Sequence, residues 1–213
     1  LHATLRRQRQ MCIRDRLVSE DWKFIKEVHS FKELPSDQIP EFIFWGRSNV
    51  GKSSLINALT QKKIAKTSRT PGRTKSLVFF QYKNIFRIVD FPGYGFSKIS
   101  SSQIFKLDLL LDQYFQKREN LKKIFLLIDS RHLLKPIDLS IIKLLEEISK
   151  KEIIFVFTKK DKIKNLKLLK KNTESLNLIR KKFNKNIFNT SIKESNGIVL
   201  LKKFLFKSQN IHD

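Results

Sequence analysis

The sequence predicts an α/β protein with a three-layer, doubly wound fold: a mostly parallel sheet of about six strands, with one antiparallel edge strand, between two layers of helices. The main observation is that strand-like and helix-like segments alternate from residue 41 onward. Two strand-like segments, Ile124 to Ile128 and Ile153 to Phe157, are continuous apolar runs, which are typical of strands buried on both faces. Such alternation indicates parallel strands joined by crossover helices. Sheets of this kind bind ligands in the loops at the carboxyl ends of their strands.

Between residues 41 and 102 the sequence predicts three strands, one helix and two loops. They are a strand at Glu41 to Gly46, a helix at Gly51 to Leu59, a polar loop at 61–76, strands at Leu77 to Tyr82 and Ile85 to Val89 around a turn at Lys83 and Asn84, and a loop at 91–102. The two adjacent strands form a hairpin, and this hairpin supplies the antiparallel strand.

After residue 102, apolar residues recur at three- and four-residue steps, which indicates amphipathic helices between the buried strands. The expected elements are a helix with the stripe Ile104, Leu107, Leu111 and Tyr114, the strand Ile124 to Ile128, a helix opened by Pro136, the strand Ile153 to Phe157, a helix from Leu166 to Phe183, a weak strand Ile187 to Thr190, and a closing helix from Ile198 to Leu205. Proline suits the first turn of a helix, because the N–H that it lacks has no partner there.

Length and composition set the domain organisation. The 213 residues, 40% of them hydrophobic, fit one α/β domain. We expect this domain at residues 41–208, after a lead-in at 17–40 and before a short tail at 209–213. Residues 1–16 (LHATLRRQRQMCIRDR) have no helix or strand period, and we expect a non-native or disordered extension there.

Apolar runs and cysteine usage exclude two classes of protein. The longest purely apolar runs, such as Ile124 to Ile128, fall far short of the roughly 18 residues that a membrane helix needs. The single cysteine, Cys12, excludes a disulfide framework and a cysteine-based zinc site. We therefore expect no membrane partner and a reducing, cytoplasmic location.

The charge balance is strongly basic. The chain has 44 Lys and Arg against 20 Asp and Glu, a net charge of +24, and about +20 remains without residues 1–16, which hold five Arg and one Asp. Such a field attracts polyanions, of which nucleic acid is the most obvious. The alternative is a lysine-biased genome that places lysine on every surface.

A phosphate-binding motif follows the first predicted strand. The residues that match G-x-x-x-x-G-K-[ST] are Gly46, Arg47, Ser48, Asn49, Val50, Gly51, Lys52 and Ser53. A strand precedes them and a helix follows, so backbone N–H groups and the helix N-terminus face the anion. We expect Lys52 to reach the terminal phosphates and the Ser53 hydroxyl to bind Mg²⁺.

A second metal contact is expected at the end of the strand Ile85 to Val89. The residues that follow this strand are Asp90, Phe91, Pro92 and Gly93. A carboxylate in this place holds Mg²⁺ through water, and a glycine N–H donates to a γ-phosphate. Asp-x-Pro-Gly alone is an ordinary turn, and its weight comes from its place after the phosphate loop.

A base-reading motif follows the strand Ile153 to Phe157. The residues Thr158, Lys159, Lys160 and Asp161 resemble the guanine box [NT]-K-x-D of GTPases. The carboxylate of Asp161 accepts two hydrogen bonds from guanine that adenine cannot supply, and the stem of Lys159 covers the base. The alternative is a solvated cluster of charges. Thr190 and Ser191, after the last strand, are expected to supply backbone groups at the base edge.

Five strings together resemble one family, the EngB ribosome-assembly GTPases of the TrmE-Era-EngA-EngB group. They are GRSNVGKSSLINAL at 46–59, TSRTPGRT at 67–74, DFPGYGF at 90–96, DSRH at 129–132 with Asp138, and TKKDK at 158–162. DSRH resembles a stretch that other small GTPases lack. The resemblance covers the chain from about residue 20 to its end and implies a P-loop GTPase fold.

The resemblance adds residues and partners that the motifs alone do not give. It implies that Thr74 closes over Mg²⁺ within a switch whose nucleotide contacts are Gly72, Arg73, Thr74, Lys75 and Ser76, and that Asn189, Thr190 and Ser191 form the base loop. It implies that GTP and GDP are the ligands, that the large ribosomal subunit precursor and its rRNA are the partners, and that the function is linked to the cell cycle and septation. Nothing in the sequence calls for a dimer, so we expect a monomer.

The sequence leaves the roles of several residues open. Asn49 either helps to hold K⁺ beside the phosphates, as in related GTPases, or braces the loop by hydrogen bonding. Tyr94 stands where Ras-like enzymes place a glutamine that orients water. The alternative for Tyr94 is a role in packing or in contact with a partner. His132 is either a general base or a loop residue that forms hydrogen bonds. No catalytic residue is assigned. The rival functions are a GTPase of tRNA modification, a P-loop ATPase or kinase, and an RNA-binding protein with a degenerate nucleotide site.

Overall fold

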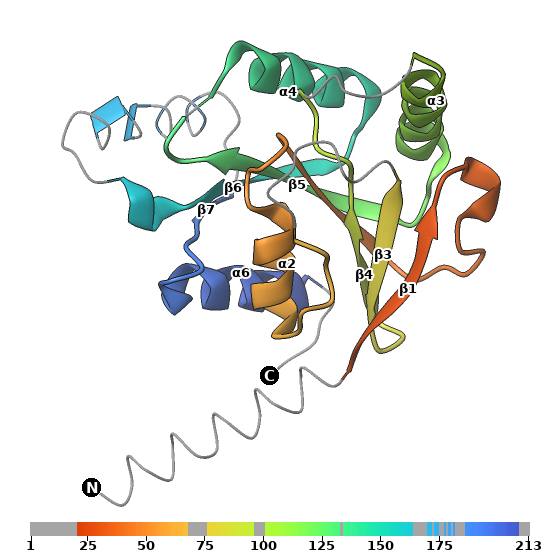
Figure 1. Cartoon of the computed structure of the whole chain (residues 1–213), viewed down its shortest axis with the longest axis horizontal. Helices are drawn as coiled ribbons and strands as arrows, with labels where there is room; N and C mark the ends of the chain where they lie inside the picture. The colour runs from red at the N-terminus through yellow and green to blue at the C-terminus, as the bar shows by residue number, and fades with distance from the viewer. Residues whose placement is uncertain are drawn as a thin grey trace, which may run out of the picture.

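The computed structural model describes residues 21–67, 76–95, 101–132, 134–163, 170–171, 173–174, 177, 179, 181 and 186–208. In this part of the chain one twisted sheet separates two layers of helices (Figure 1). The α/β, three-layer architecture expected from the alternating pattern is confirmed.

The sheet has seven strands in the order β1-β3-β4-β2-β5-β6-β7. They are β1 (Trp22–Val28), β2 (Glu41–Gly46), β3 (Leu77–Tyr82), β4 (Phe86–Asp90), β5 (Leu121–Asp129), β6 (Glu152–Thr158) and β7 (Ile187–Asn189). β2 pairs in parallel with β4 and β5, and the parallel pairing continues through β6 to β7. β3 is antiparallel to both of its neighbours, β1 and β4. The carboxyl ends of β2, β4, β5, β6 and β7 therefore lie at one edge of the sheet.

Helices cover both faces of this sheet. They are α2 (Lys52–Thr60), α3 (Ser101–Lys117), α4 (Pro136–Ile148) and α6 (Ser195–Lys207), with 3₁₀ turns η1 (Phe31–Glu33) and η2 (Lys160–Lys162). α3 and α4 lie on one side, and α2 and α6 lie on the other (Figure 1). The described residues between 170 and 181 are helical, as the apolar stripe predicts. None of the described helices has the length and apolarity needed to cross a membrane.

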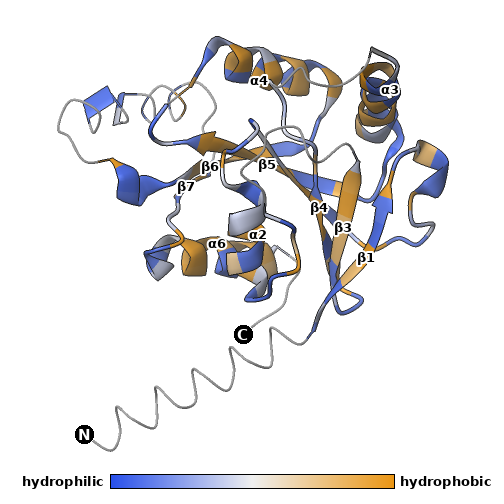
Figure 2. Ribbon diagram, viewed as in Figure 1, coloured by the Kyte–Doolittle hydropathy of each residue, from blue (hydrophilic) through white to orange (hydrophobic). Residues whose placement is uncertain are grey.

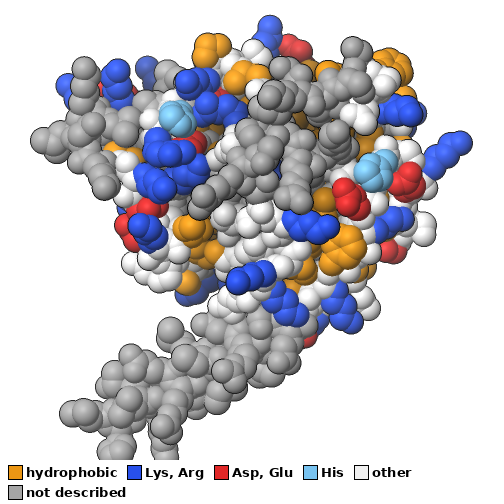
Figure 3. Space-filling view, in the orientation of Figure 1, with side chains coloured by type: hydrophobic (Ala, Val, Ile, Leu, Met, Phe, Trp, Pro, Cys, Tyr) orange, Lys and Arg blue, Asp and Glu red, His pale blue; other side chains and the backbone are white. Residues whose placement is uncertain are grey.

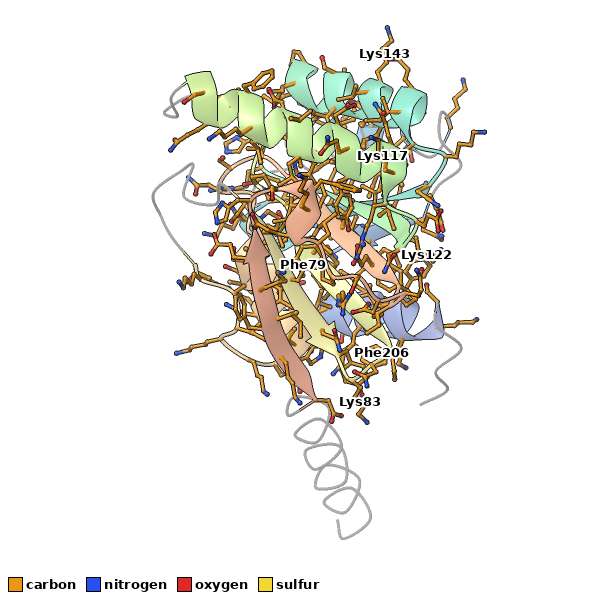
Figure 4. All side chains as sticks on the ribbon, turned by 90° about the vertical axis from the view of Figure 1, so that its right-hand side faces the viewer. Phe79, Lys83, Lys117, Lys122, Lys143 and Phe206 are labelled. Atoms are coloured by element: carbon orange, nitrogen blue, oxygen red, sulfur yellow. The ribbon has the colours of Figure 1, made fainter. Side chains whose placement is uncertain are left out.

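Two buried clusters, one on each face of the sheet, form the core. In β5, Ile124, Leu126 and Ile128 belong to the cluster under α3 and α4, whereas Phe125 and Leu127 belong to the cluster over α2 and α6. This explains why the strand is a continuous apolar run. Figure 2 shows hydrophobic residues along the strands and in bands on the helices. In Figure 4, Phe79 and Phe206 mark the two clusters, and Lys143 extends from α4 into solvent.

The lead-in before residue 41 contains a strand that the sequence did not predict. β1 pairs with β3 and forms the edge, so the antiparallel strand β3 lies second from the edge and not at the edge as expected. An edge strand can carry many polar side chains, because only part of it is buried. In β1 only Trp22 and Val28 are buried, and a bulge between Phe24 and Lys26 interrupts the alternation. Together these features hide the strand pattern.

Candidate functional site

Loops that follow β2, β4, β5, β6 and β7 meet at one edge of the sheet, as the topology requires. We call this set of residues, 46–53, 90–95, 129–132, 158–162 and 189–191, the carboxyl edge. It contains the phosphate motif, the Asp-x-Pro-Gly turn and the guanine-like box, which are far apart in the sequence. Their convergence is a property of the parallel strand order and agrees with the general position of ligand sites in doubly wound sheets.

The phosphate motif has the backbone expected of an anion-binding loop. β2 ends at Gly46, and α2 begins at Lys52 with Gly51 as its N-terminal cap. Gly51 has φ +103°, and a Cβ at Gly46 would lie 2.7 Å from the carbonyl oxygen of Leu127. Both positions therefore require glycine. The loop directs the N-terminus of α2, with its partial positive charge, toward the carboxyl edge.

Lys52 and Asp90 lie together at the carboxyl edge. The Lys52 ammonium donates a hydrogen bond to the Asp90 carboxylate, and both side chains are buried. Burial raises the pKa of Asp90, and the neighbouring Lys52 opposes this rise. The structure thus brings the first motif and the turn after β4 into direct contact, over 38 residues of sequence.

The turn after β4 packs against the phosphate loop. Its backbone is fixed by the indole N–H of Trp45, which donates to the Pro92 carbonyl at 2.9 Å, and Phe91 is fully buried. A Cβ at Gly93 would lie 2.8 Å from the Ser48 nitrogen, so only glycine fits. The Ser48 N–H donates to the Tyr94 carbonyl at 3.1 Å, which joins the two loops.

Hydrogen bonds also connect the guanine-like box to the phosphate loop. The Thr158 hydroxyl donates to the Val50 carbonyl at 2.6 Å, and the Lys159 ammonium donates to the Asn49 carbonyl at 2.6 Å. The threonine that replaces the commoner asparagine thus still supplies a donor to the phosphate loop. The stem of Lys159 crosses Gly51, with Cε 3.4 Å from the position of a Cβ there.

Asp161, in η2, receives a hydrogen bond from the loop after β7. The Ser191 hydroxyl donates to its carboxylate at 2.8 Å, and the Lys160 N–H donates to the Thr190 carbonyl at 3.1 Å. The Thr190 hydroxyl points back to β6, where it donates to the Phe157 carbonyl. Asn189 is half-buried at the end of β7. Of the three residues expected in the base loop, Ser191 is the one whose side chain reaches Asp161.

The structure adds residues that sequence reasoning left without a role. Asp138, fully buried in the first turn of α4, accepts a hydrogen bond from the Tyr94 hydroxyl at 2.8 Å and lies 3.3 Å from Arg47 Nε. Burial, and secondly the Asp138 charge, raise the pKa of Tyr94. This phenol therefore stays neutral at physiological pH. His132 is exposed, and its backbone N–H donates to the Asp129 carbonyl at 3.0 Å.

Asp129 is the second residue for which the sequence suggested no role. Its position was nevertheless marked in the sequence, because it stands directly after the apolar run of β5. The Lys159 ammonium donates to its carboxylate at 2.9 Å, and Arg131 Nη2 donates at 2.7 Å. Burial by itself would raise the pKa of Asp129, but the hydrogen bonds from Arg131 and Lys159 outweigh it and lower the pKa to about 2. Asp129 is therefore an anion at neutral pH.

Four expected contacts, Gly72, Arg73, Thr74 and Lys75, lie outside the described residues. Ser76, the last of that group, is buried, and its hydroxyl donates to the Glu27 carboxylate of β1. This contact ties the end of the loop between α2 and β3 to the edge strand.

The oxygen ligands at the carboxyl edge suit Mg²⁺. No three His, Cys, Asp or Glu side chains in the described part of the chain gather as a metal site. What the edge offers is the half-buried Ser53 hydroxyl, next to Lys52 in the first turn of α2, and the buried Asp90 carboxylate. Mg²⁺ prefers this arrangement, because it keeps several waters and binds through one or two protein oxygens together with substrate phosphates.

Four features together define the class of P-loop GTPases: a doubly wound sheet, a phosphate loop, a strand-end aspartate beside this loop, and a guanine-like box. The family model described as "50S ribosome-binding GTPase" matches residues 41–159. The chain is 39% identical over 197 residues to the "Probable GTP-binding protein EngB" of Bradyrhizobium diazoefficiens, covering 90% of both chains. It is also 39% identical over 187 residues to the Mycoplasma genitalium protein of that name, covering 88% of this chain and 96% of the other.

Solved structures agree with these relatives. A crystal structure of a probable GTP-binding protein EngB matches with a TM-score of 0.61 and 26% identity, over 81% of this chain and 99% of the other. Era in complex with MgGDPNP and part of 16S ribosomal RNA also gives a TM-score of 0.61 and 26% identity, over 78% of this chain and 56% of Era. The chain belongs to the EngB family of P-loop GTPases, enzymes that bind and hydrolyse GTP.

Proposed function

We propose that this GTPase is a Mg²⁺-dependent switch that acts on the assembling large ribosomal subunit in the cytoplasm. The observation that carries the proposal is the convergence, at one edge of the sheet, of every described segment that a guanine nucleotide requires. The match to a family described as 50S ribosome-binding supports the choice of partner. The net charge of +24 supports it too, because ribosomal RNA is a dense polyanion.

For the phosphate half of the site, we assign roles to four residues that the structure brings together and to Thr74, which lies outside the described residues. Lys52 leaves Asp90 to contact the terminal phosphates, while the Gly93 N–H donates to the γ-phosphate. Ser53 would bind Mg²⁺ directly, Asp90 would hold it through water, and Thr74 would close over it from the switch. When bound, Mg²⁺ neutralises charge that develops on the β- and γ-phosphates.

For the base half, Asp161 selects guanine and Lys159 lies along the base. We place the nucleotide contacts in residues 46–53, 72–76, 90–93, 158–161 and 189–191. Replacing Asp161 by Asn reverses one hydrogen bond, so Asp161→Asn should lose GTP and gain xanthosine triphosphate. The exposed Asp108 of α3 supplies the matched control, Asp108→Asn. Equal affinity of the wild-type protein for ATP and GTP would contradict the assignment.

The two roles weighed for Asn49 remain to be separated by experiment. Asn49 has φ +63°, and its backbone carbonyl already accepts the Lys159 ammonium. A second cation at the same oxygen is disfavoured by charge repulsion, so K⁺ would use the side-chain oxygen of Asn49. GTP hydrolysis should then run faster in potassium than in sodium at equal ionic strength, and Asn49→Ala should remove the difference. A wild-type rate that is indifferent to the cation leaves Asn49 as a brace.

Sedimentation with ribosomal particles tests the proposed partner. Figure 3 shows Lys and Arg side chains distributed over much of the visible face, and a basic protein binds any RNA at low salt. The specific expectation is that the protein travels with large-subunit particles, more with a GTP analogue than with GDP, at a salt concentration where naked RNA no longer binds. Equal binding to both subunits in every nucleotide state would contradict the proposal and favour a general RNA-binding GTPase.

A further inference from the structure

Asp129 is a buried anion in the wall of the candidate base site. It is the last residue of β5 and stands in register with Thr158, the first residue of the guanine-like box on β6. β5 and β6 lie side by side (Figure 1). The Ser130 N–H donates to the Thr158 carbonyl at 3.0 Å, which continues the pairing one residue beyond the strand. The position of Asp129 relative to the box is therefore fixed by the sheet.

Four hydrogen bonds fix the carboxylate of Asp129. Arg131 supplies three: its backbone N–H and Nε each donate to Oδ1 at 3.0 Å, and Nη2 donates to Oδ2 at 2.7 Å. The fourth comes from Lys159 at 2.9 Å. Only 4% of Asp129 is exposed to solvent, so water cannot replace these donors. A carboxylate bound in this way has one orientation, and that orientation is set by Arg131.

The side chain of Lys159 requires fixed hydrogen-bond partners to stay in one conformation. Lysine has a long stem with several rotatable bonds, and holding it in one rotamer costs conformational entropy. Here its ammonium is shared between the Asp129 carboxylate and the Asn49 carbonyl, and its backbone is left-handed, with φ +58°. The stem is stretched between these fixed points across Gly51 of the phosphate loop.

We propose that Asp129 is a positioning residue for guanine-nucleotide binding: together with Arg131 it holds the Lys159 stem in the conformation that receives the base. This inference rests on the proposed guanine site at Thr158 to Asp161 and gives that site a support outside the motif. Asp129 touches neither the base nor the phosphates in this mechanism, and it acts only through Lys159. Its contribution is the same for GTP and GDP, which differ only in the γ-phosphate.

A double-mutant cycle between Asp129 and Lys159 tests the proposal, with Kd measured by a fluorescent GDP analogue on the full chain. Asp129→Asn should weaken binding of both GTP and GDP about tenfold, the size expected for a charged hydrogen bond. Lys159→Ala should weaken binding by at least as much. In the Lys159→Ala background, Asp129→Asn should add no more than about twofold, because its effect passes through the missing side chain.

Two further variants keep the test decisive. If Asp129→Asn does not fold, the half-buried Arg131 replaces it: Arg131→Ala should weaken GDP binding severalfold, again only when Lys159 is present. The matched control is Asp37→Asn, which also removes a carboxylate from an arginine pair, between Asp37 and Arg87, but at the opposite end of the strands. It should leave nucleotide affinity unchanged.

The outcomes separate this inference from the proposed function. Wild-type affinity in Asp129→Asn or in Lys159→Ala, or losses that simply add in the double mutant, would overturn the positioning role while the guanine preference of the wild-type protein stands. A wild-type protein that binds ATP as tightly as GTP would overturn the guanine site and this inference with it. Loss of GTP binding with retained GDP binding would also overturn it, since a base anchor cannot distinguish the two.

Discussion

The two ends of the sheet both bury charged groups, but they use them differently. At the amino ends of β2 and β4, a group that we call the anchor cluster comprises the buried Glu41, Arg87 and Tyr114, the half-buried Arg118 and the exposed Asp37. Glu41 is fully buried and accepts hydrogen bonds from the Tyr114 hydroxyl at 2.5 Å and from Arg118 Nη2 at 2.5 Å. Arg87 forms a two-bond fork with Asp37, at 2.7 and 2.5 Å.

At the carboxyl edge the charged groups also pair, but their partners come from loops and from the N-terminus of a helix. Lys52 contacts Asp90, and Lys159 contacts Asp129. The anchor cluster connects β2 and β4 to the end of α3, at the end of the strands opposite the phosphate loop. Each ion pair at the carboxyl edge lies next to the phosphate loop. We therefore expect loss of charge in the anchor cluster to lower stability more than nucleotide affinity, and loss of charge at the carboxyl edge to lower nucleotide affinity more than stability.

The largest effect is expected when the anchor cluster is broken. Glu41→Gln removes the carboxylate that pairs with Arg118 and lies 3.6 Å from Arg87, and it should lower the free energy of unfolding by about 3–5 kcal/mol, because the largely buried Arg118 loses its carboxylate partner. Urea denaturation measures this loss. The folded fraction should bind GDP within twofold of the wild-type protein. A loss of nucleotide affinity that exceeds the loss of stability would erase the distinction between the two ends.

The next effect belongs to the carboxyl edge and should show the opposite behaviour. Lys52→Ala should weaken GTP binding about a hundredfold, or about 2.7 kcal/mol, since it removes charge-assisted bonds to phosphate. Titration with a fluorescent GTP analogue measures the affinity. The unfolding free energy without nucleotide should change less than in Glu41→Gln, because protonation of Asp90 relieves the unpaired charge. Unchanged GTP affinity would remove Lys52 from the phosphate site.

Acid should weaken the carboxyl edge through Asp129 over a defined pH range. The folded-state pKa of about 2 lies below the ordinary 3.8, so ionised Asp129 stabilises the folded protein above the ordinary value, and this stability is lost as the pH falls through about 2. The difference in unfolding free energy between the wild-type protein and Asp129→Asn should be about 1–2 kcal/mol at pH 7 and should shrink between about pH 4 and pH 2. A difference independent of pH would contradict the assigned charge.

The smallest effect is expected at Tyr94, in the loop after β4 that packs against the phosphate loop. Tyr94→Phe removes the hydrogen bond to Asp138 and should lower the unfolding free energy by about 1 kcal/mol. Single-turnover GTP hydrolysis should stay within about threefold of the wild-type rate, since the hydroxyl donates to a buried carboxylate and not to water. A large fall in that rate with unchanged stability would return Tyr94 to the list of catalytic candidates.

Much of the fold could be predicted because its signals are local. The apolar runs of β5 and β6 identify strands buried on both faces, and Pro136 marks the first turn of α4, as the structure confirms. β1 was missed for the converse reason, since a half-exposed edge strand with a bulge has no clear alternation. Its pairing with β3 depends on the rest of the sheet being present.

Local sequence was enough to predict the class of fold, the phosphate loop and the strand-end positions of Asp90 and the guanine-like box. These are encoded in short strings whose conformation follows from glycine, from the helix N-terminus and from strand-end topology. Two pairings could be seen only in the folded chain: Ser191, and not Thr190, donates to Asp161, and Asp138 accepts the Tyr94 hydroxyl from 44 residues away. Such pairs depend on side-chain direction and burial across separate elements, and these leave no period in the sequence.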